Sequence, residues 1–203
     1  AVFSFNQEVA RPYCVVYPAT EGVGEGTVYP VNFASTQPYT VGTFASGVAP
    51  MYGYAAEEGV VSMQHLTGVL RLAIAGNGEK VTSIKATAQK GKIAGAYTVD
   101  CTTGVVTPSA EAVNTLTVTF AEPLVLGAEA TPVYVAVPAG NYGTFAITIN
   151  TEAHQKMTVK FSSEKKPINA GSVREFSEFT YEANTADSEE AFIIDSEEAL
   201  IEF

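Results

Sequence analysis

Six short segments of the chain alternate between apolar and polar residues, and this alternation constrains the fold more than any other feature of the sequence. A strand that is buried on one face shows this period of two. In Thr115–Phe120, the side chains of Leu116, Val118 and Phe120 would face a core, while three threonines would face solvent. The other five segments are 70–74, 84–88, 133–137, 144–149 and 156–161. The pattern predicts an all-β protein.

The residues between these segments predict tight connections. Gly76-Asn77-Gly78 favours a β-hairpin between 70–74 and 81–88. Short turns also follow one another near the end of the series, which predicts an antiparallel meander of strands 132–138, 142–150 and 155–162. Short strands at this spacing are typical of a β-sandwich. We therefore expect two antiparallel sheets with roughly seven or more strands, similar to transthyretin-like or immunoglobulin-like domains.

The acidic charge is concentrated at the C-terminal end. The formal net charge is −11 over 203 residues, and residues 182–203 hold eight acids without any Lys or Arg. We expect a sandwich domain over 1–182. Residues 183–203 would be an acidic linker and the start of a following domain that is not present in this chain. The rest of the sequence has no basic stripe of the kind that nucleic-acid binding requires.

No residue pattern in the sequence is typical of catalysis or of metal binding. The two histidines, His65 and His154, form no HExxH pattern, and no nucleophile or carboxylate lies close to His65 in the sequence. A GxSxG elbow is absent, and the glycine-rich stretch 22–26 lacks the Lys-Ser/Thr end of a phosphate-binding loop. We predict that the protein is not an enzyme and has no cofactor and no metal site, with His65 as part of the scaffold.

Cys14 and Cys101 are the two cysteines, and their spacing matches no CxxC or zinc pattern. Two separate buried thiols are favoured, because a sandwich of this size does not need a covalent cross-link. A disulfide formed in an oxidising compartment is the alternative.

Four tyrosines are candidates for ligand binding: Tyr29, Tyr39, Tyr52 and Tyr54. They lie within 26 residues, in segments interrupted by proline and glycine. An aromatic ring with a polar tip suits recognition of glycans or proteins. The alternative is that these rings only cover the open ends of the sandwich.

Several short motifs occur in a characteristic order between about residues 12 and 182. They are Cys14–Pro18, Gln37–Tyr39, Ala49–Ala55, Met63–Leu72, Val81–Ile84, Ala94-Gly95, Val135–Tyr142 and Ile168–Val173. Each motif is short, but their order and spacing together resemble the fimbrillin-like family of outer-membrane-anchored surface lipoproteins of Gram-negative anaerobes, and in particular the N-terminal domain of such proteins.

The resemblance implies an exported protein on the cell surface, held at the outer membrane by an N-terminal lipid anchor that is missing from this sequence. It implies a non-enzymatic surface adhesin or fimbrillin-like, pilus-related module. The expected partners are other fimbrial or surface subunits, host proteins or glycans, and no nucleic acid. Pilins of this type polymerise by strand donation, so an unpaired strand edge is expected. A surface glycan-binding accessory protein is the alternative function.

Overall fold

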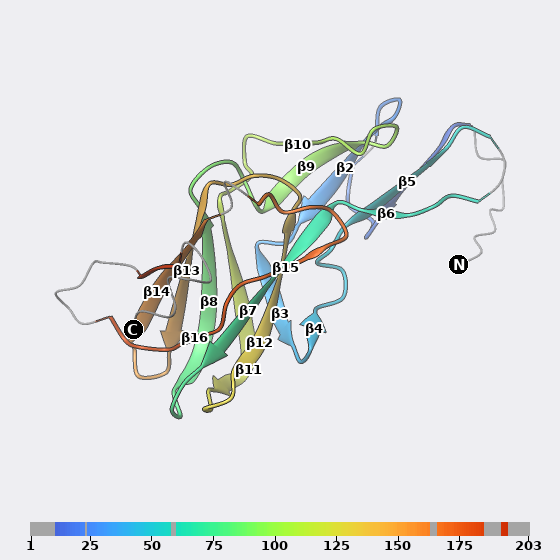
Figure 1. Cartoon of the computed structure of the whole chain (residues 1–203). Helices are drawn as coiled ribbons and strands as arrows, with labels where there is room; N and C mark the ends of the chain where they lie inside the picture. Colours follow the sequence, from blue (N-terminus) through green and yellow to red (C-terminus); the bar gives the residue numbers. More distant parts are fainter. Residues whose placement is uncertain (1–10, 23, 58–59, 163–165, 185–191, 195–203) are drawn as a thin grey trace.

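The computed structural model describes residues 11–22, 24–57, 60–162, 166–184 and 192–194 (Figure 1). Within this part of the chain, the regular elements are strands, β1 to β17, and no helix is present. The all-β prediction is therefore confirmed.

Two sheets face each other and form a β-sandwich. The larger sheet has seven strands in the order β17-β14-β13-β8-β11-β3-β4, and the smaller has the order β12-β7-β15, with β16 also paired to β7. The larger sheet comprises β3 (Thr36–Thr40), β4 (Thr43–Phe44), β8 (Lys80–Ala88), β11 (Thr115–Val125), β13 (Thr144–Thr151), β14 (Lys156–Ser162) and β17 (Phe192–Ile194). The smaller comprises β7 (Thr67–Ala75), β12 (Thr131–Pro138), β15 (Val173–Glu175) and β16 (Phe179–Thr180).

The alternating segments supply the core between these sheets. In β13, Phe145, Ile147 and Ile149 are fully buried, whereas the residues between them are half-exposed. Burying one such side chain is worth about 1.5–3 kcal/mol. The period of two therefore sets which face of each strand points inward.

The turn after β7 does not form the predicted hairpin. β7 pairs with β12, whereas β8 pairs with β11 and β13, so this connection crosses from one sheet to the other. The amides of Gly76 and Gly78 donate to the carbonyls of Gly127 and Leu126, at 2.8 Å each. The turn is thus held by the neighbouring β11–β12 connection rather than by a β7–β8 ladder.

The predicted meander is correct for two of its three strands. β13 and β14 pair antiparallel, as expected, but β12 belongs to the opposite sheet. The prediction that the sheets are purely antiparallel is also wrong. In the smaller sheet, β15 and β16 each run parallel to β7. In the larger sheet, β3 runs parallel to β11, and β17 runs parallel to β14. The segment that follows β14 returns along β7 and buries Phe179 and Tyr181 in the sandwich core.

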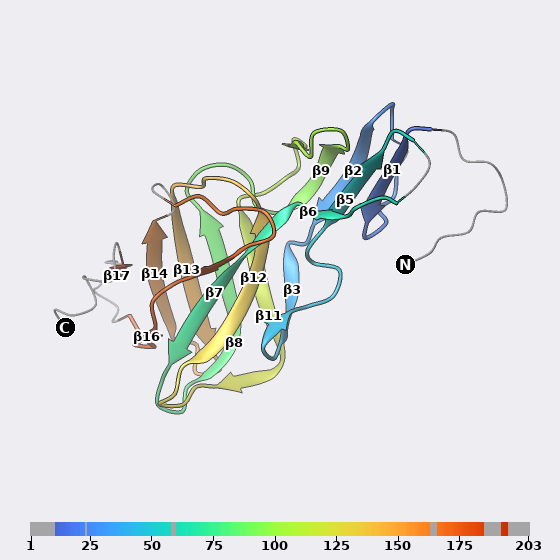
Figure 2. The ribbon, with the colours of Figure 1, turned by 45° about the vertical axis from the view of Figure 1, so that its right-hand side comes forward.

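A second region extends from one end of the sandwich (Figure 2). One three-stranded sheet has the order β1-β5-β6, and the other has the order β10-β9-β2. The strands are β1 (Tyr13–Tyr17), β2 (Val28–Phe33), β5 (Met51–Ala55), β6 (Gln64–His65), β9 (Gly95–Asp100) and β10 (Val106–Pro108). We call these six strands the lobe.

The lobe has its own small core. The buried residues of this lobe core are Val31, Phe33, Leu66, Tyr97, Val99, Cys101 and Ala112. The rings of Phe33 and Tyr97 meet edge to face, with centroids 4.7 Å apart, a favourable aromatic geometry. The sequence patterns did not predict this region as a separate packing unit.

A single buried glutamine joins the two sheets of the sandwich. The Gln37 side chain is on β3 and is 2% exposed. Its Nε2 donates to the carbonyl of Ala136 on β12 at 2.7 Å, and its Oε1 accepts from the Ala136 amide at 3.0 Å. One side chain thus satisfies both backbone groups of Ala136.

The predicted boundary between residues 182 and 183 stays a prediction. Phe192–Ile194, which lies within the predicted linker and following domain, forms a short strand beside β14. Residues 195–203, with the predicted start of a following domain, lie outside the described residues.

Candidate functional site

The four predicted tyrosines do not form one site. Tyr29 on β2 and both Tyr52 and Tyr54 on β5 belong to the lobe, whereas Tyr39 is on β3 of the sandwich. The Tyr39 ring packs against Phe120, with centroids 4.9 Å apart. Any shared role in ligand binding would therefore be limited to the lobe.

Two of the lobe tyrosines are packed into the scaffold. A Cβ atom at Gly24 would lie 2.4 Å from the Tyr29 ring, and one at Gly104 would lie 2.2 Å from the Tyr52 hydroxyl. Side chains larger than glycine would displace these rings. The Tyr52 hydroxyl also donates to Gln64 Oε1 at 3.2 Å. Tyr29 and Tyr52 both pack against the lobe core, which favours a structural role for them.

Exposure distinguishes Tyr17 and Tyr54 from those two. The Tyr17 side chain is 50% exposed and that of Tyr54 is 37% exposed. Tyr17 was not among the predicted residues, although Tyr13, Val15 and Tyr17 share one face of a strand by their spacing of two. That spacing is the signal by which the sequence could have identified this residue.

The β1-β5-β6 sheet has one inward and one outward face. Cys14, Val16 and Tyr52 face inward, because they pack against the lobe core. Strand alternation then turns Tyr13, Val15 and Tyr17 outward, together with Met51, which is paired with Tyr17. Val61 and Met63 lie against Gly53 on β5. We call the set Tyr13, Val15, Tyr17, Met51, Val61 and Met63 the outer face of the lobe.

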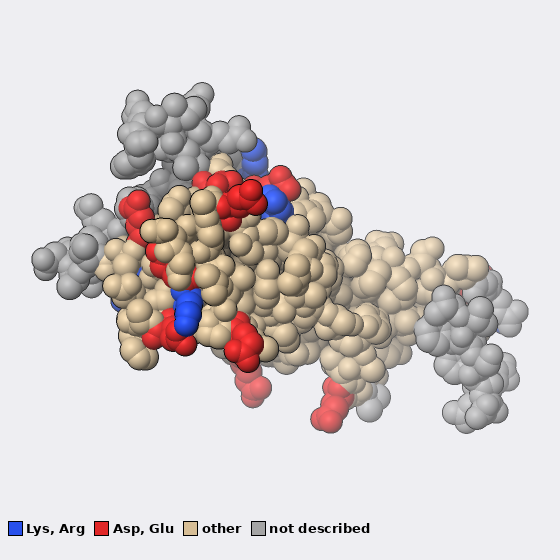
Figure 3. Space-filling model, turned by 90° about the horizontal axis from the view of Figure 1, so that it is seen from below, with Lys and Arg blue, Asp and Glu red and all other residues tan. Residues whose placement is uncertain are grey.

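This outer face carries no charged side chain. The lobe strands hold one acid, Asp100, and no Lys or Arg. The ion pair of Arg11 and Glu57, at 3.7 Å, lies beside β1 and β5. Figure 3 shows that on one side of the molecule the coloured charges gather over the sandwich and that few lie over the lobe. Tyr and Met on an uncharged surface suit contact with an uncharged protein surface or with sugar rings.

β1 lies at the end of its sheet. It pairs with β5 along one edge, and no strand of the described part of the chain pairs with its other edge. Exposed strand edges can accept an additional strand.

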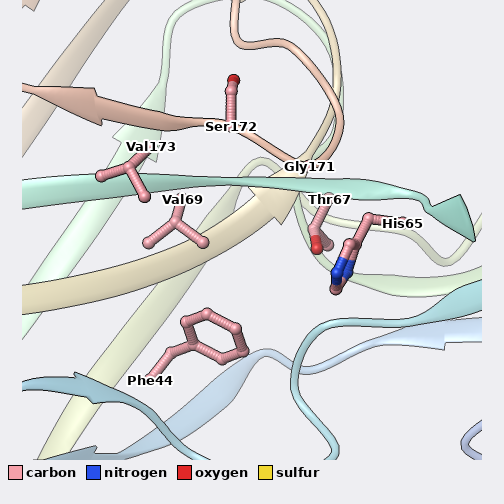
Figure 4. A pocket seen from close by; sticks show the side chains of 7 residues that line it. All are labelled: Phe44, His65, Thr67, Val69, Gly171, Ser172 and Val173. Atoms are coloured by element: carbon pink, nitrogen blue, oxygen red, sulfur yellow. The ribbon is translucent and has the colours of Figure 1, made fainter.

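His65 lines a shallow depression of about 90 Å³ where β6 leads into β7 (Figure 4). The lining residues are Phe44, His65, Thr67, Val69, Gly171, Ser172 and Val173. They include two hydroxyl groups but no carboxylate that could orient the imidazole as a general base. His154 lies in the β13–β14 turn, with a φ of 58°. Among the described residues, no three His, Cys, Asp or Glu side chains are grouped so that they could hold a metal ion.

The two cysteines are not separate in the structure. Both are thiols, with Cys101 in the lobe core and Cys14 packed against that core. Burial is the main cause that raises the pKa of Cys101 to about 12, and burial also raises the pKa of Tyr97 to about 12. Both groups are therefore neutral at physiological pH.

The sequence matches no protein family model and no curated protein. The solved structures that are similar to this chain include two that are described as putative cell adhesion proteins. One, from Bacteroides uniformis, has a TM-score of 0.52 at 17% identity, with 83% of this chain and 66% of that chain covered. The other, from Bacteroides ovatus, has a TM-score of 0.51 at 12% identity, with 90% and 68% covered. This chain spans about two thirds of their length, and the likeness shows a shared fold.

No helix in the described part of the chain has the length and apolar character needed to span a membrane.

Proposed function

We propose that this chain is a non-enzymatic bacterial cell-surface adhesin module of the fimbrillin-like type, and that the outer face of the lobe contacts its partner. The observation that carries the proposal is the uncharged face bearing Tyr13, Tyr17 and Met51 at one end of a sandwich. The fold shared with two proteins described as cell adhesion proteins supports the same function.

The proposed location is the outside of the cell, with attachment to the outer membrane through an N-terminal lipid anchor. The proposed partners are host proteins, glycans or other surface subunits. Aromatic side chains contribute strongly to such contacts because they bury a large area at modest entropic cost, and methionine side chains adapt to the shape of a partner. Tyr17 is the residue whose loss should matter most, since half of its side chain is accessible.

The test is a binding screen of the labelled chain against immobilised extracellular host proteins and a glycan array. We expect the Tyr17→Ala variant to bind its best hit at least about tenfold more weakly. Val41→Ala is the matched control, because Val41 is an 82% exposed apolar residue of the sandwich. Unchanged affinity in a Tyr13→Ala/Tyr17→Ala double variant with an unchanged melting temperature would exclude the outer face as the binding surface.

The alternative is a surface glycan-binding accessory protein, and the exposure of Tyr54 favours it. Among the four tyrosines predicted from the sequence, Tyr54 is exposed, while the other three are half-buried. Tyr54 is paired with Cys14 and so lies on the opposite face of the sheet from Tyr17. Loss of soluble-glycan binding in Tyr54→Ala, with binding retained in Tyr17→Ala, would support this alternative over the adhesin.

A pilus-related role would require the chain to assemble with other subunits. The β1 edge is one place in the described structure where such pairing is open. Light scattering over a concentration series tests self-assembly: a ladder of multiples supports a polymerising subunit, whereas a monomer at all concentrations supports a display module.

A further inference from the structure

The two cysteines come from the two different sheets of the lobe and meet in its interior. Cys14 is on β1, and Cys101 directly follows β9. The Cys14 side chain packs against the lobe core, of which Cys101 is a member. The Cys14 side chain is close enough to Cys101 to contribute, after burial, to the raised pKa of the Cys101 thiol.

Backbone hydrogen bonds hold both residues in place. Cys14 lies in the middle of the β1–β5 ladder, opposite Tyr54. The Cys101 amide donates to the carbonyl of Thr27 at 2.8 Å, and the turn that follows is closed by the Gly104 amide, which donates to the Asp100 carbonyl at 2.7 Å. Two thiols that firmly placed strands bring into the same small core can be joined with little movement of the backbone.

We propose that Cys14 and Cys101 are a site of oxidative modification, at which a disulfide oxidant converts the two thiols into an intramolecular disulfide that joins the two sheets of the lobe. The oxidant is a small-molecule or protein disulfide. This inference does not depend on the proposed function.

The reaction balances through thiol–disulfide exchange. The deprotonated sulfur of Cys14 attacks one sulfur of the oxidant, forming a mixed disulfide and releasing the first oxidant thiol. Cys101 then loses its proton, and its sulfur attacks Sγ of Cys14 and displaces the second oxidant thiol. The two cysteines lose two electrons and two protons, and the oxidant disulfide gains them as two thiols.

Burial sets the order of these steps. Cys14 is half-buried, whereas Cys101 is 1% exposed and so is out of reach of an incoming oxidant. The raised pKa of Cys101, about 12, keeps its thiolate scarce at neutral pH. Attack by Cys101 on the mixed disulfide is therefore the slower step.

The bond would fasten the strand that carries the exposed Tyr17. In the reduced chain, β1 is hydrogen-bonded to β5 alone among the described strands. The disulfide would attach it covalently to the β10-β9-β2 sheet and enclose the 86 residues between positions 14 and 101. Closing a loop of this length stabilises the folded state mainly by restricting the unfolded chain.

The experiment oxidises the purified full chain in a glutathione disulfide buffer, then unfolds it and labels free thiols with a maleimide. We expect no label, a mass lower by two hydrogen atoms than that of the reduced chain, and a Cys14–Cys101 linked peptide after digestion. Two labels per chain at redox equilibrium, or a disulfide-linked dimer, would overturn the proposal.

Thermal unfolding with and without a reductant tests whether the bond fastens the lobe. We expect reduction to lower the melting temperature of the oxidised chain by about 5–15 °C. The single-thiol variants Cys14→Ser and Cys101→Ala are the controls, and reductant should not change their melting temperatures. A melting temperature of the oxidised wild-type chain that does not respond to reductant would also contradict the proposal.

Discussion

The sandwich and the lobe are both built from paired strands, but they bury very different amounts of apolar surface. The sandwich core contains twenty-five buried residues among those described, whereas the lobe core contains seven. The lobe also presents uncharged aromatic and methionine side chains on an outer face, and its strand β1 has one unpaired edge. We infer from this difference that the sandwich supplies most of the stability, while the lobe presents the outer face that we propose as the binding surface.

Removing one large side chain from each core should show this difference most strongly. Phe145 is fully buried in the sandwich, and Phe145→Ala should lower the free energy of unfolding by about 3–5 kcal/mol. Phe33 is 2% exposed in the lobe core. We expect Phe33→Ala to accelerate amide hydrogen exchange in β2 and β9 while leaving exchange in β13 nearly unchanged, because a small core opens locally. Equal acceleration in β13 would mean that the two regions unfold as one unit.

Removing the Gln37 side chain, which links the two sheets of the sandwich, should give the next largest loss of stability. Gln37→Ala leaves the buried amide and carbonyl of Ala136 without their side-chain partner, so unfolding should become easier by about 2–4 kcal/mol. Gln89→Ala is the control, because Gln89 Oε1 also accepts from a backbone amide, that of Thr144, but in an exposed position. Gln89→Ala should lower the free energy of unfolding by less than about 1 kcal/mol. Chemical denaturation measures both, and equal losses would argue against a special role for burial at Gln37.

Removing the hydroxyl group of one buried tyrosine in each region should have a smaller effect, and one that differs between the two regions. In the sandwich, the buried Tyr142 hydroxyl donates to the Pro138 carbonyl at 2.9 Å. In the lobe, the buried Tyr97 hydroxyl has no hydrogen-bond partner among the described residues. Tyr142→Phe should therefore cost about 1–2 kcal/mol, while Tyr97→Phe should be neutral or stabilise by up to about 1 kcal/mol. A loss of stability in Tyr97→Phe would reveal a hydrogen bond to that hydroxyl in solution.

Alkaline pH should produce the smallest effect. It is a difference between the wild-type chain and Tyr97→Phe in how steeply the free energy of unfolding falls as the pH rises. Burial raises the pKa of Tyr97 from 10.0 to about 12, and mainly burial raises that of Cys101 from 9.0 to about 12. Their contribution to stability is therefore complete below pH 9 and is lost as the pH rises toward 12, because the unfolded chain releases these protons first. Chemical denaturation at pH 8, 10 and 11 should show this decline in the free energy of unfolding. The free energy of unfolding of Tyr97→Phe should fall less steeply between pH 10 and 11. Identical slopes would mean that Tyr97 does not stay neutral in the folded chain.

The sequence predicts the strands of the sandwich better than their pairing. Alternation places Leu116, Val118 and Phe145 on buried faces correctly, because solvent and core act on each strand locally. It does not select the partner strand. The turn at 76–78 fits a hairpin by composition, yet β7 and β8 lie in opposite sheets with their buried faces toward one core.

The candidate site is harder to predict, because it depends on which rings the fold covers. Tyr29 and Tyr52 fit the composition of a binding loop, but Gly24 and Gly104 allow the chain to pack closely against these two rings. Gly104 is far from Tyr52 in the sequence, so this contact cannot be read from a local pattern. Tyr17 is exposed because β1 is at the end of its sheet, which no local pattern specifies. The contact of Cys14 with Cys101 likewise requires the two sheets of the lobe to pack face to face.

The Gln37 contact has a further consequence for molecules at high concentration. Because the amide and carbonyl of Ala136 point toward Gln37, they point away from β7, and so do those of Pro132, Tyr134 and Pro138 by alternation. Two of these four residues, Pro132 and Pro138, lack an N–H group, and the Ala136 amide already donates to Gln37. Three of the four residues therefore cannot offer a donor to another strand. A neighbouring copy that met β12 side by side would find almost no template for β-sheet growth, which protects a concentrated solution of this protein against aggregation through that edge.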